Sequence, residues 1–428
     1  MKLKIKYKEI IFTTLLFMFI YSFPIYGLLN SSYLANMIAF GIVIFSSKKI
    51  VFSYDLLKNK FSVFVFLFYF FIVVYSIVIS CISGSYDFYI IKPWINNVIS
   101  VIGAILLITI YISYFSQNDH FERFLFYILL IQSIYIIIAI LFPELSNNIL
   151  MLIRTQAEIE KMSIYGGIRG VGLSGSMAFG LAITMSILGF FSTIWLFKYS
   201  TMSFFLKFIV LLICIFASFS AGRTAILGYL LGFFLVSPYI FNKKNIFGLL
   251  ALCPIIVIFL IYLYENNTSF HMLFNKYSAY VFEPITLFLN TGSFKVSSLK
   301  SLESMYFMPP IDTFIIGDAK YVDPSNPDLY YMGTDSGYMR FILYYGLLGS
   351  LIPYFAFLFL CFYVVTKCKS KQILMLYSLI ILMSFIFHYK GEVVFFAVDY
   401  MKILFLVSFY LLFKNGVQYD DSRINPHI

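Results

Sequence analysis

Long apolar runs, separated by short polar segments, follow one another along almost the whole chain. A run of roughly 20 apolar residues is long enough to cross the hydrocarbon core of a bilayer as a helix. About twelve runs meet this criterion, at residues 9–29, 32–47, 61–82, 97–115, 122–142, 174–197, 202–221, 223–241, 246–264, 337–364, 373–389 and 399–413. The pattern predicts an all-α polytopic membrane protein in which residues 1–428 form a single integral membrane domain.

One apolar run, from Phe208 to Phe241, is too long for a single crossing. As one helix its 34 residues would extend about 51 Å, against a hydrocarbon core of about 30 Å. Ser220 and Gly222, both weak helix formers, lie in its middle and predict a hairpin. Arg223 is the only charged residue of the run and would lie at the tip. A full charge in such a setting is costly and is usually functional.

Clusters of lysine and arginine fall on alternate loops between the predicted helices. Short loops rich in these residues stay on the cytoplasmic side, so both termini are expected in the cytoplasm and the Arg223 tip outside. Two long connections also lie outside under this topology: a periplasmic loop at residues 143–173, which includes a glycine-rich segment around Arg169, and a large periplasmic loop at residues 265–336. Connections of such length are usually functional or disordered, so an active site is expected on this face.

Composition excludes several other classes of protein. With 61% hydrophobic and 12% charged residues, the chain is unlike a soluble domain. The net charge of +10 is explained mostly by the topology signal, so no nucleic-acid partner is expected. The five cysteines show no CxxC spacing and the four histidines are scattered, which predicts neither a disulfide framework nor a metal site. No nucleotide-binding fingerprint is found, and no cofactor is expected.

Three arginines, Arg169, Arg223 and Arg340, are predicted at or just within the outer ends of helices, each near glycine or other small residues. A guanidinium group donates paired hydrogen bonds to phosphate and stays charged at any relevant pH. Together the three predict a pyrophosphate clamp. Each could instead only anchor a helix end at the lipid head groups.

Two acidic residues of the outer face are expected to have different surroundings. Asp335 directly precedes the helix that carries Arg340, where it could cap the helix or act as a proton acceptor. Glu392 lies in a short outer turn, where a solvated pair with Lys390 is expected.

Four segments, in this order along the chain, resemble the Wzy-type O-antigen polymerases and the related O-antigen ligases: IRGVGLSGSMAFG, SAGRTAILG, IIGDAKY and TDSGYMRFILYYGLLGS. The resemblance extends over the whole chain in topology but rests on these short segments by motif. It implies a C-type glycosyltransferase fold in the bacterial inner (cytoplasmic) membrane. Such an enzyme takes undecaprenyl-pyrophosphate-linked oligosaccharide repeat units at the periplasmic face, joins them into O-antigen or a related surface polysaccharide, and releases undecaprenyl pyrophosphate.

The resemblance also implies roles for single residues. Arg169 and Arg223 match arginines that such proteins direct at the lipid pyrophosphate, and Arg340 would assist or orient. Asp335 stands where the ligases usually carry a histidine, which favours a polymerase and makes Asp335 the candidate catalytic base. The donor and the acceptor would both be lipid-linked oligosaccharides held among membrane lipids, and a regulator of chain length is a further conceivable partner.

Two other functions stay open. An O-antigen ligase would transfer the glycan to the lipid A core by the same chemistry. A flippase or exporter of the lipid-linked sugar also has about a dozen helices, but transporters tend to show repeated halves and charges buried in mid-membrane. The sequence shows no clear internal repeat.

Overall fold

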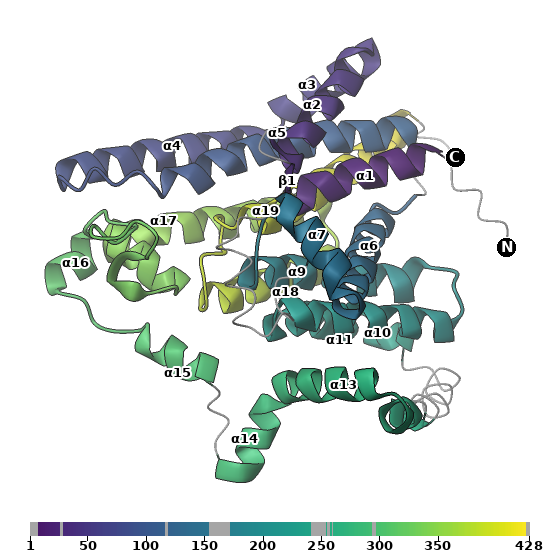
Figure 1. The fold of residues 1–428 in the computed structure, drawn as a ribbon. Coiled ribbons are helices and arrows are strands. Elements are labelled where there is room, and N and C mark those ends of the chain that lie inside the picture. The colour runs from purple at the N-terminus through teal and green to yellow at the C-terminus, as the bar shows by residue number, and fades with distance from the viewer. Residues whose placement is uncertain are drawn as a thin grey trace. The chain divides into compact units, whose positions relative to one another are not determined.

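The computed structural model describes residues 7–25, 29–115, 119–153, 172–240, 254, 257–258, 260–292 and 297–424. These residues are predominantly helical, and the strands among them are the two-residue strands β1 (Pro24–Ile25) and β2 (Leu29–Asn30), which pair antiparallel (Figure 1). Eight of the described helices are long and apolar enough to cross a membrane. The chain is therefore a multi-pass helical membrane protein, while the number of twelve crossings stays a prediction.

The eight candidate crossings agree closely with predicted ones. They are α4 (Lys60–Ile82), α5 (Ile91–Tyr114), α6 (Glu122–Leu141), α9 (Phe179–Ile194) continued by η1 (Trp195–Tyr199), α10 (Phe204–Ala221), η2 (Arg223–Ala225) continued by α11 (Ile226–Ile240), α17 (Gly337–Cys368) and α18 (Lys371–His388). A bent pair, α2 (Ser31–Ile44) and α3 (Ser47–Lys58), is a possible ninth crossing among the described residues.

Three other predicted crossings have a different outcome. The helix expected at residues 9–29 is the shorter α1 (Tyr7–Tyr21), because the chain enters β1 at Pro24. The helix expected at residues 399–413 lies within α19 (Val398–Ile424). Most of the predicted crossing at residues 246–264 lies outside the described residues.

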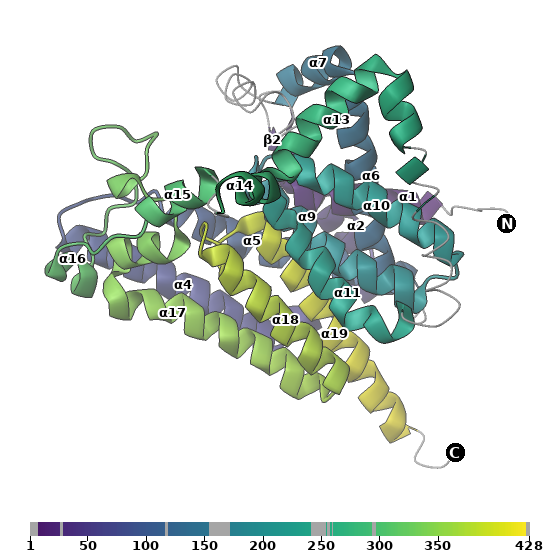
Figure 2. The same ribbon diagram turned by 90° about the horizontal axis from the view of Figure 1, so that it is seen from below.

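The chain forms two compact units. The first unit consists of Met1–Phe124, Ser174–Ser176 and Met305–Ile428. Within it, α5 packs against α2, α4 and α19, and α17 packs against α4, α18 and α19; the contact of α17 with α18 can be followed in Figure 2. Burial of the N-terminal ends of α17 and α19 in this unit positions the groups described below.

The second unit consists of Leu125–Leu173 and Met177–Ser304. At its centre, α9 is buried along its whole length from Leu181 to Ile194 by α10 and α11. Small residues allow this close packing: the amide of Gly228 donates to Ser186 Oγ at 2.8 Å. The unit also contains α7 (Pro143–Ile153), α13 (Thr268–Val281), α14 (Glu283–Thr291) and α15 (Ser297–Ser304).

The predicted hairpin break is confirmed. α10 ends at Ala221, Gly222 is extended, and Arg223 begins the next helical segment. The amide of Gly222 donates to the carbonyl of Ser218, which closes the last turn of α10. The 34-residue run is thus two helices, as its length required.

The large loop at residues 265–336 is divided between the units, since it leaves the second unit after Ser304 and enters the first at Met305. In its second-unit part, α15 ends before Pro309. Beyond the prolines, α16 (Ile311–Ile316) and η3 (Tyr331–Gly333) lead to α17.

Candidate functional site

Two of the segments that carry the family resemblance dock onto each other in the first unit. The chain after α16 donates two backbone hydrogen bonds to α17, from Asp318 N to Leu343 O at 2.8 Å and from Ala319 N to Tyr344 O at 3.2 Å. These carbonyls are free because α17 breaks at Gly346, where φ is 70° and ψ is 175°. A β-carbon on Gly346 would overlap the backbone of α16, so this close approach requires glycine.

Carboxylates secure the loop that follows. Asp318 accepts hydrogen bonds from the hydroxyls of Thr313 and Tyr331, at 2.9 and 2.7 Å. Asp87, in the connection between α4 and α5, accepts the backbone amides of Tyr321 and Val322, at 2.7 and 3.0 Å. Both acidic groups therefore hold the loop in place.

Arg340 is enclosed by this loop. Its side chain is 5% exposed and forms an ion pair with Glu392, with Nη1 2.7 Å from Oε2. The guanidinium lies between the rings of Tyr321 and Tyr330, at 3.8 and 3.6 Å from their centroids. Arginine stacks well on aromatic faces. In this arrangement its charge is already balanced, which favours the orienting role over direct contact with a phosphate.

Glu392 differs from the sequence interpretation. Its side chain is only 7% exposed, so the expected solvated pair with Lys390 is wrong. The carboxylate also accepts the hydroxyl of Tyr321 at 2.9 Å. Its other oxygen, Oε1, is buried and has no hydrogen-bond partner among the described residues. Burial raises the pKa of Glu392, and the charge of Arg340 opposes this shift.

Asp335 lies at the entrance to α17, next to this cluster. The residue that caps α17 is Ser336, whose hydroxyl accepts from Met339 N, so capping does not occupy Asp335. The carboxylate of Asp335 accepts no hydrogen bond from the described residues, and the residue is exposed. Partial loss of solvation nevertheless raises its pKa, while the nearby charges of Arg340 and Lys390 act to lower it.

Arg223 lies in the second unit and is covered by the first part of the large loop. Its Nη2 donates to Glu283 Oε2 at 2.6 Å, and its guanidinium lies 4.7 Å from the centroid of the Tyr280 ring. The side chain remains 23% exposed. Its Nη1 is buried and has no hydrogen-bond partner among the described residues. One of the two terminal nitrogens of this guanidinium therefore lacks a hydrogen-bond partner among these residues.

Only two of the three arginines of the predicted clamp lie among the described residues. Asp335 and Arg340 come together in the first unit, Arg223 belongs to the second, and Arg169 lies outside the described residues. The convergence of the three arginines therefore stays a prediction.

Comparisons with models of protein families, with curated proteins and with solved structures found no match. The residues themselves must therefore carry the functional argument. Within the part of the chain that the structure describes, no group of three or more histidine, cysteine, aspartate and glutamate side chains is placed to hold a metal ion.

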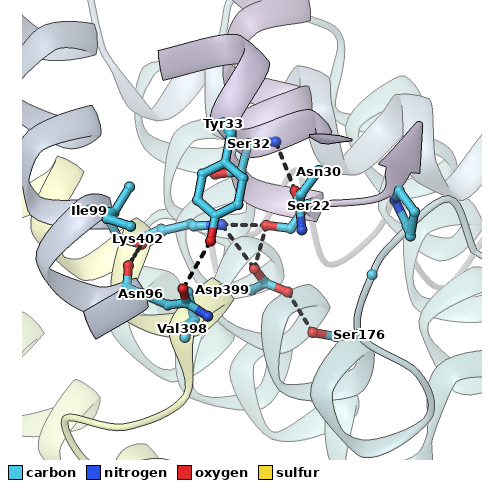
Figure 3. A pocket seen from close by; sticks show the side chains of 13 residues that line it. Ser22, Asn30, Ser32, Tyr33, Asn96, Ile99, Ser176, Val398, Asp399 and Lys402 are labelled. Atoms are coloured by element: carbon cyan, nitrogen blue, oxygen red, sulfur yellow. Dashed lines mark hydrogen bonds and ion pairs between the residues drawn. The ribbon is translucent and has the colours of Figure 1, made fainter. Parts of the chain in front are cut away.

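Sequence reasoning missed one polar cluster altogether. Asp399 and Lys402, in the first turns of α19, form an ion pair at 3.1 Å and are almost fully buried (Figure 3). The signal was present in the sequence, as two opposite charges three residues apart in the predicted crossing at 399–413. Ionisable residues inside such a crossing are functional candidates by default.

Proposed function

We propose that the protein is a membrane glycosyltransferase of the Wzy type, which joins lipid-linked oligosaccharide repeat units into a surface polysaccharide. The observation that carries the proposal is the Asp335 carboxylate, which is exposed, accepts no hydrogen bond from the described residues and has a raised pKa. A catalytic base works best when its pKa lies close to the operating pH. A carboxylate with structural duties would instead be engaged, as Asp87 and Asp318 are.

The chemistry requires little beyond position and charge. A hydroxyl oxygen of the acceptor sugar attacks the anomeric carbon of the donor and forms the new glycosidic bond. The bond from that carbon to the lipid pyrophosphate breaks, and the pyrophosphate leaves with the electron pair. Asp335 takes the hydroxyl proton, a contribution worth roughly 10²- to 10⁴-fold in rate. Donors aimed at the departing pyrophosphate stabilise its developing charge.

The arginines divide these tasks. Arg223 offers its unpartnered Nη1 to the pyrophosphate, and Arg169 is proposed to act with it. Arg340 is held by Glu392 and by two tyrosine rings, so its charge is fixed near Asp335 and does not move with substrate. A bound, preoriented charge of this kind lowers the reorganisation needed in the transition state.

The experiment is complementation of a strain that lacks the gene with Asp335→Asn. We expect the surface polysaccharide to be reduced to single repeat units, whereas the wild-type gene restores the full ladder of chain lengths. The matched control is Asp328→Asn, which changes an exposed carboxylate of the same loop and should leave the ladder intact. A normal ladder from Asp335→Asn would refute the catalytic assignment.

The strain without the gene also separates the alternative functions. Loss of a polymerase leaves lipopolysaccharide capped with a single repeat. Bare lipid A core would indicate a ligase, and retention of the lipid-linked repeats on the cytoplasmic side would indicate a flippase.

A further inference from the structure

A polar pocket of about 260 Å³ lies in the first unit, where the ends of α1, α2, α5 and α19 meet. Figure 3 shows its lining side chains. Most of them are polar, and the Ser174–Ser176 segment also contributes. The amide of Gly175 donates to Tyr21 O at 2.8 Å, which fixes this segment against the end of α1. At about 30 Å³ per water molecule, the pocket has room for roughly nine waters, close to the space of one sugar ring.

One wall of the pocket carries no net charge. Lys402 pairs with Asp399, and it also donates to the hydroxyl of Ser22. Asp399 accepts further hydrogen bonds from Ser22 at 2.8 Å and from Ser176. A buried pair of this kind is stable only when its remaining hydrogen bonds are satisfied. The positive charge of Lys402 is thus neutralised, and the wall does not attract an anion.

Other side chains of the lining present donors without partners. Asn96 accepts the hydroxyl of Tyr33 through Oδ1 at 2.9 Å, and Asn30 accepts the amide of Ser32 through Oδ1 at 2.9 Å. In both asparagines the oxygen is engaged, so the NH₂ group must be the free end. No described residue accepts a hydrogen bond from either NH₂ group. Both residues line the pocket, together with Tyr33.

We propose that this pocket binds one neutral, hydroxyl-rich sugar ring of the repeat unit, an inference that rests on the proposed function. Amide NH₂ groups donate to sugar oxygens, and the Tyr33 side chain offers an aromatic surface beside them. The neutralised Lys402 argues against a phosphate, and the polar lining argues against a lipid tail. The pocket thereby selects the sugar, whereas Asp335 performs the proton transfer.

The test uses the purified full-length protein in lipid nanodiscs. The probe is the free repeat-unit oligosaccharide, released from the host polysaccharide and carrying no lipid or phosphate, and its binding is followed by saturation-transfer NMR. We expect the wild type to bind it, and Asn96→Ala and Asn96→Asp to bind it about tenfold more weakly or worse, since each loses the free donor. Asn326→Ala, an exposed asparagine outside the pocket, should bind like the wild type.

Thermal unfolding of each variant establishes that it is folded. The proposal is overturned if the wild type does not bind the oligosaccharide, or if folded Asn96→Ala binds it with unchanged affinity. Displacement of the oligosaccharide by millimolar inorganic pyrophosphate would also overturn it, because the pocket would then be an anion site. The failure of the proposed function is a different result: a strain without the gene that still makes the full ladder of chain lengths would remove the polymerase proposal without touching this binding result.

Discussion

At the residue scale, Asp335 differs from the neighbouring carboxylates in having no structural duty. Asp87 and Asp318 each accept two hydrogen bonds that secure the loop, and Glu392 holds Arg340. Asp335 accepts none from the described residues, and Ser336 caps the helix in its place. Loss of the Asp335 charge should therefore affect chemistry and leave the fold intact.

The raised pKa of Asp335 indicates in which direction the loss of its charge changes the stability of the fold. A carboxyl whose pKa is higher in the folded state binds its proton more tightly there, so its charged form disfavours folding as the pH rises through that pKa. At pH 7 Asp335→Asn removes this unfavourable charge. We expect an unchanged or slightly higher Tm in detergent, together with loss of polymer. A fall in Tm of several degrees would assign Asp335 to the structure instead.

Arg340 and Glu392 should behave in the opposite way, because both side chains are buried, at 5% and 7% exposure. Removing one partner leaves the other charge buried without compensation, at a cost of about 3–5 kcal/mol. We expect Glu392→Gln to lower the free energy of unfolding more than the double variant Arg340→Met/Glu392→Met, which leaves neither charge. The comparison is made by denaturant unfolding. Equal or greater loss in the double variant would contradict the assigned pair.

This pair also shows what local sequence cannot provide. Glu392 in a short polar turn was expected to be solvated, because nothing near it in the sequence reveals that Arg340 lies beside it. Arg223 was placed correctly, since the length of its apolar run alone forces a break beside it. The ion pair of Arg223 with Glu283 of α14 was not predicted, because the two residues are far apart in the sequence, as Arg340 and Glu392 are.

At the scale of elements, the break in α17 at Gly346 positions the loop that encloses Arg340. The sequence predicted one continuous helix at residues 337–364, because an apolar run does not reveal a kink whose cause is contact with another segment. That cause is the docking of α16, with Gly317 and Gly346 in close contact. The earlier part of the helix, which carries Arg340, is thereby set at its own angle.

The kink supplies a matched pair of substitutions. Gly346 and Gly333 both have positive φ, at 70° and 66°, but only Gly346 has neighbouring backbone where a β-carbon would lie. Both Gly→Ala variants carry a conformational cost, and Gly346, with ψ of 175°, lies in a region that essentially only glycine adopts, at a cost of about 1–3 kcal/mol. We expect Gly346→Ala to lose at least about 1 kcal/mol more, because the overlap forces the segments apart. Denaturant unfolding measures the difference, and equal losses would show that the docking is not tight.

At the scale of the whole molecule, helical content and apolar length were predictable from the sequence, since the bilayer fixes both. The division of the large loop between two units was not, because it depends on which helices its two parts cover. The lysine clusters predict a topology with both termini in the cytoplasm.

A reporter enzyme that becomes active only outside the cytoplasm tests this topology. Fusions after Ile153 and after Gly292 should be active, because both loops are expected outside. A fusion after Lys414 should be inactive, because the C-terminus is expected in the cytoplasm. Activity of the Lys414 fusion, or inactivity of the Gly292 fusion, would place the proposed site on the wrong side of the membrane for a periplasmic polymerase.

The most direct test of the central claim is reconstitution of the purified protein with undecaprenyl-pyrophosphate-linked repeat units and no other enzyme. We predict a ladder of elongated glycans from the wild type, release of undecaprenyl pyrophosphate in step with elongation, and neither product from folded Asp335→Asn. Folded wild-type protein that binds the lipid-linked repeats but yields no elongated glycan, or an Asp335→Asn variant that elongates at the wild-type rate, would contradict the account.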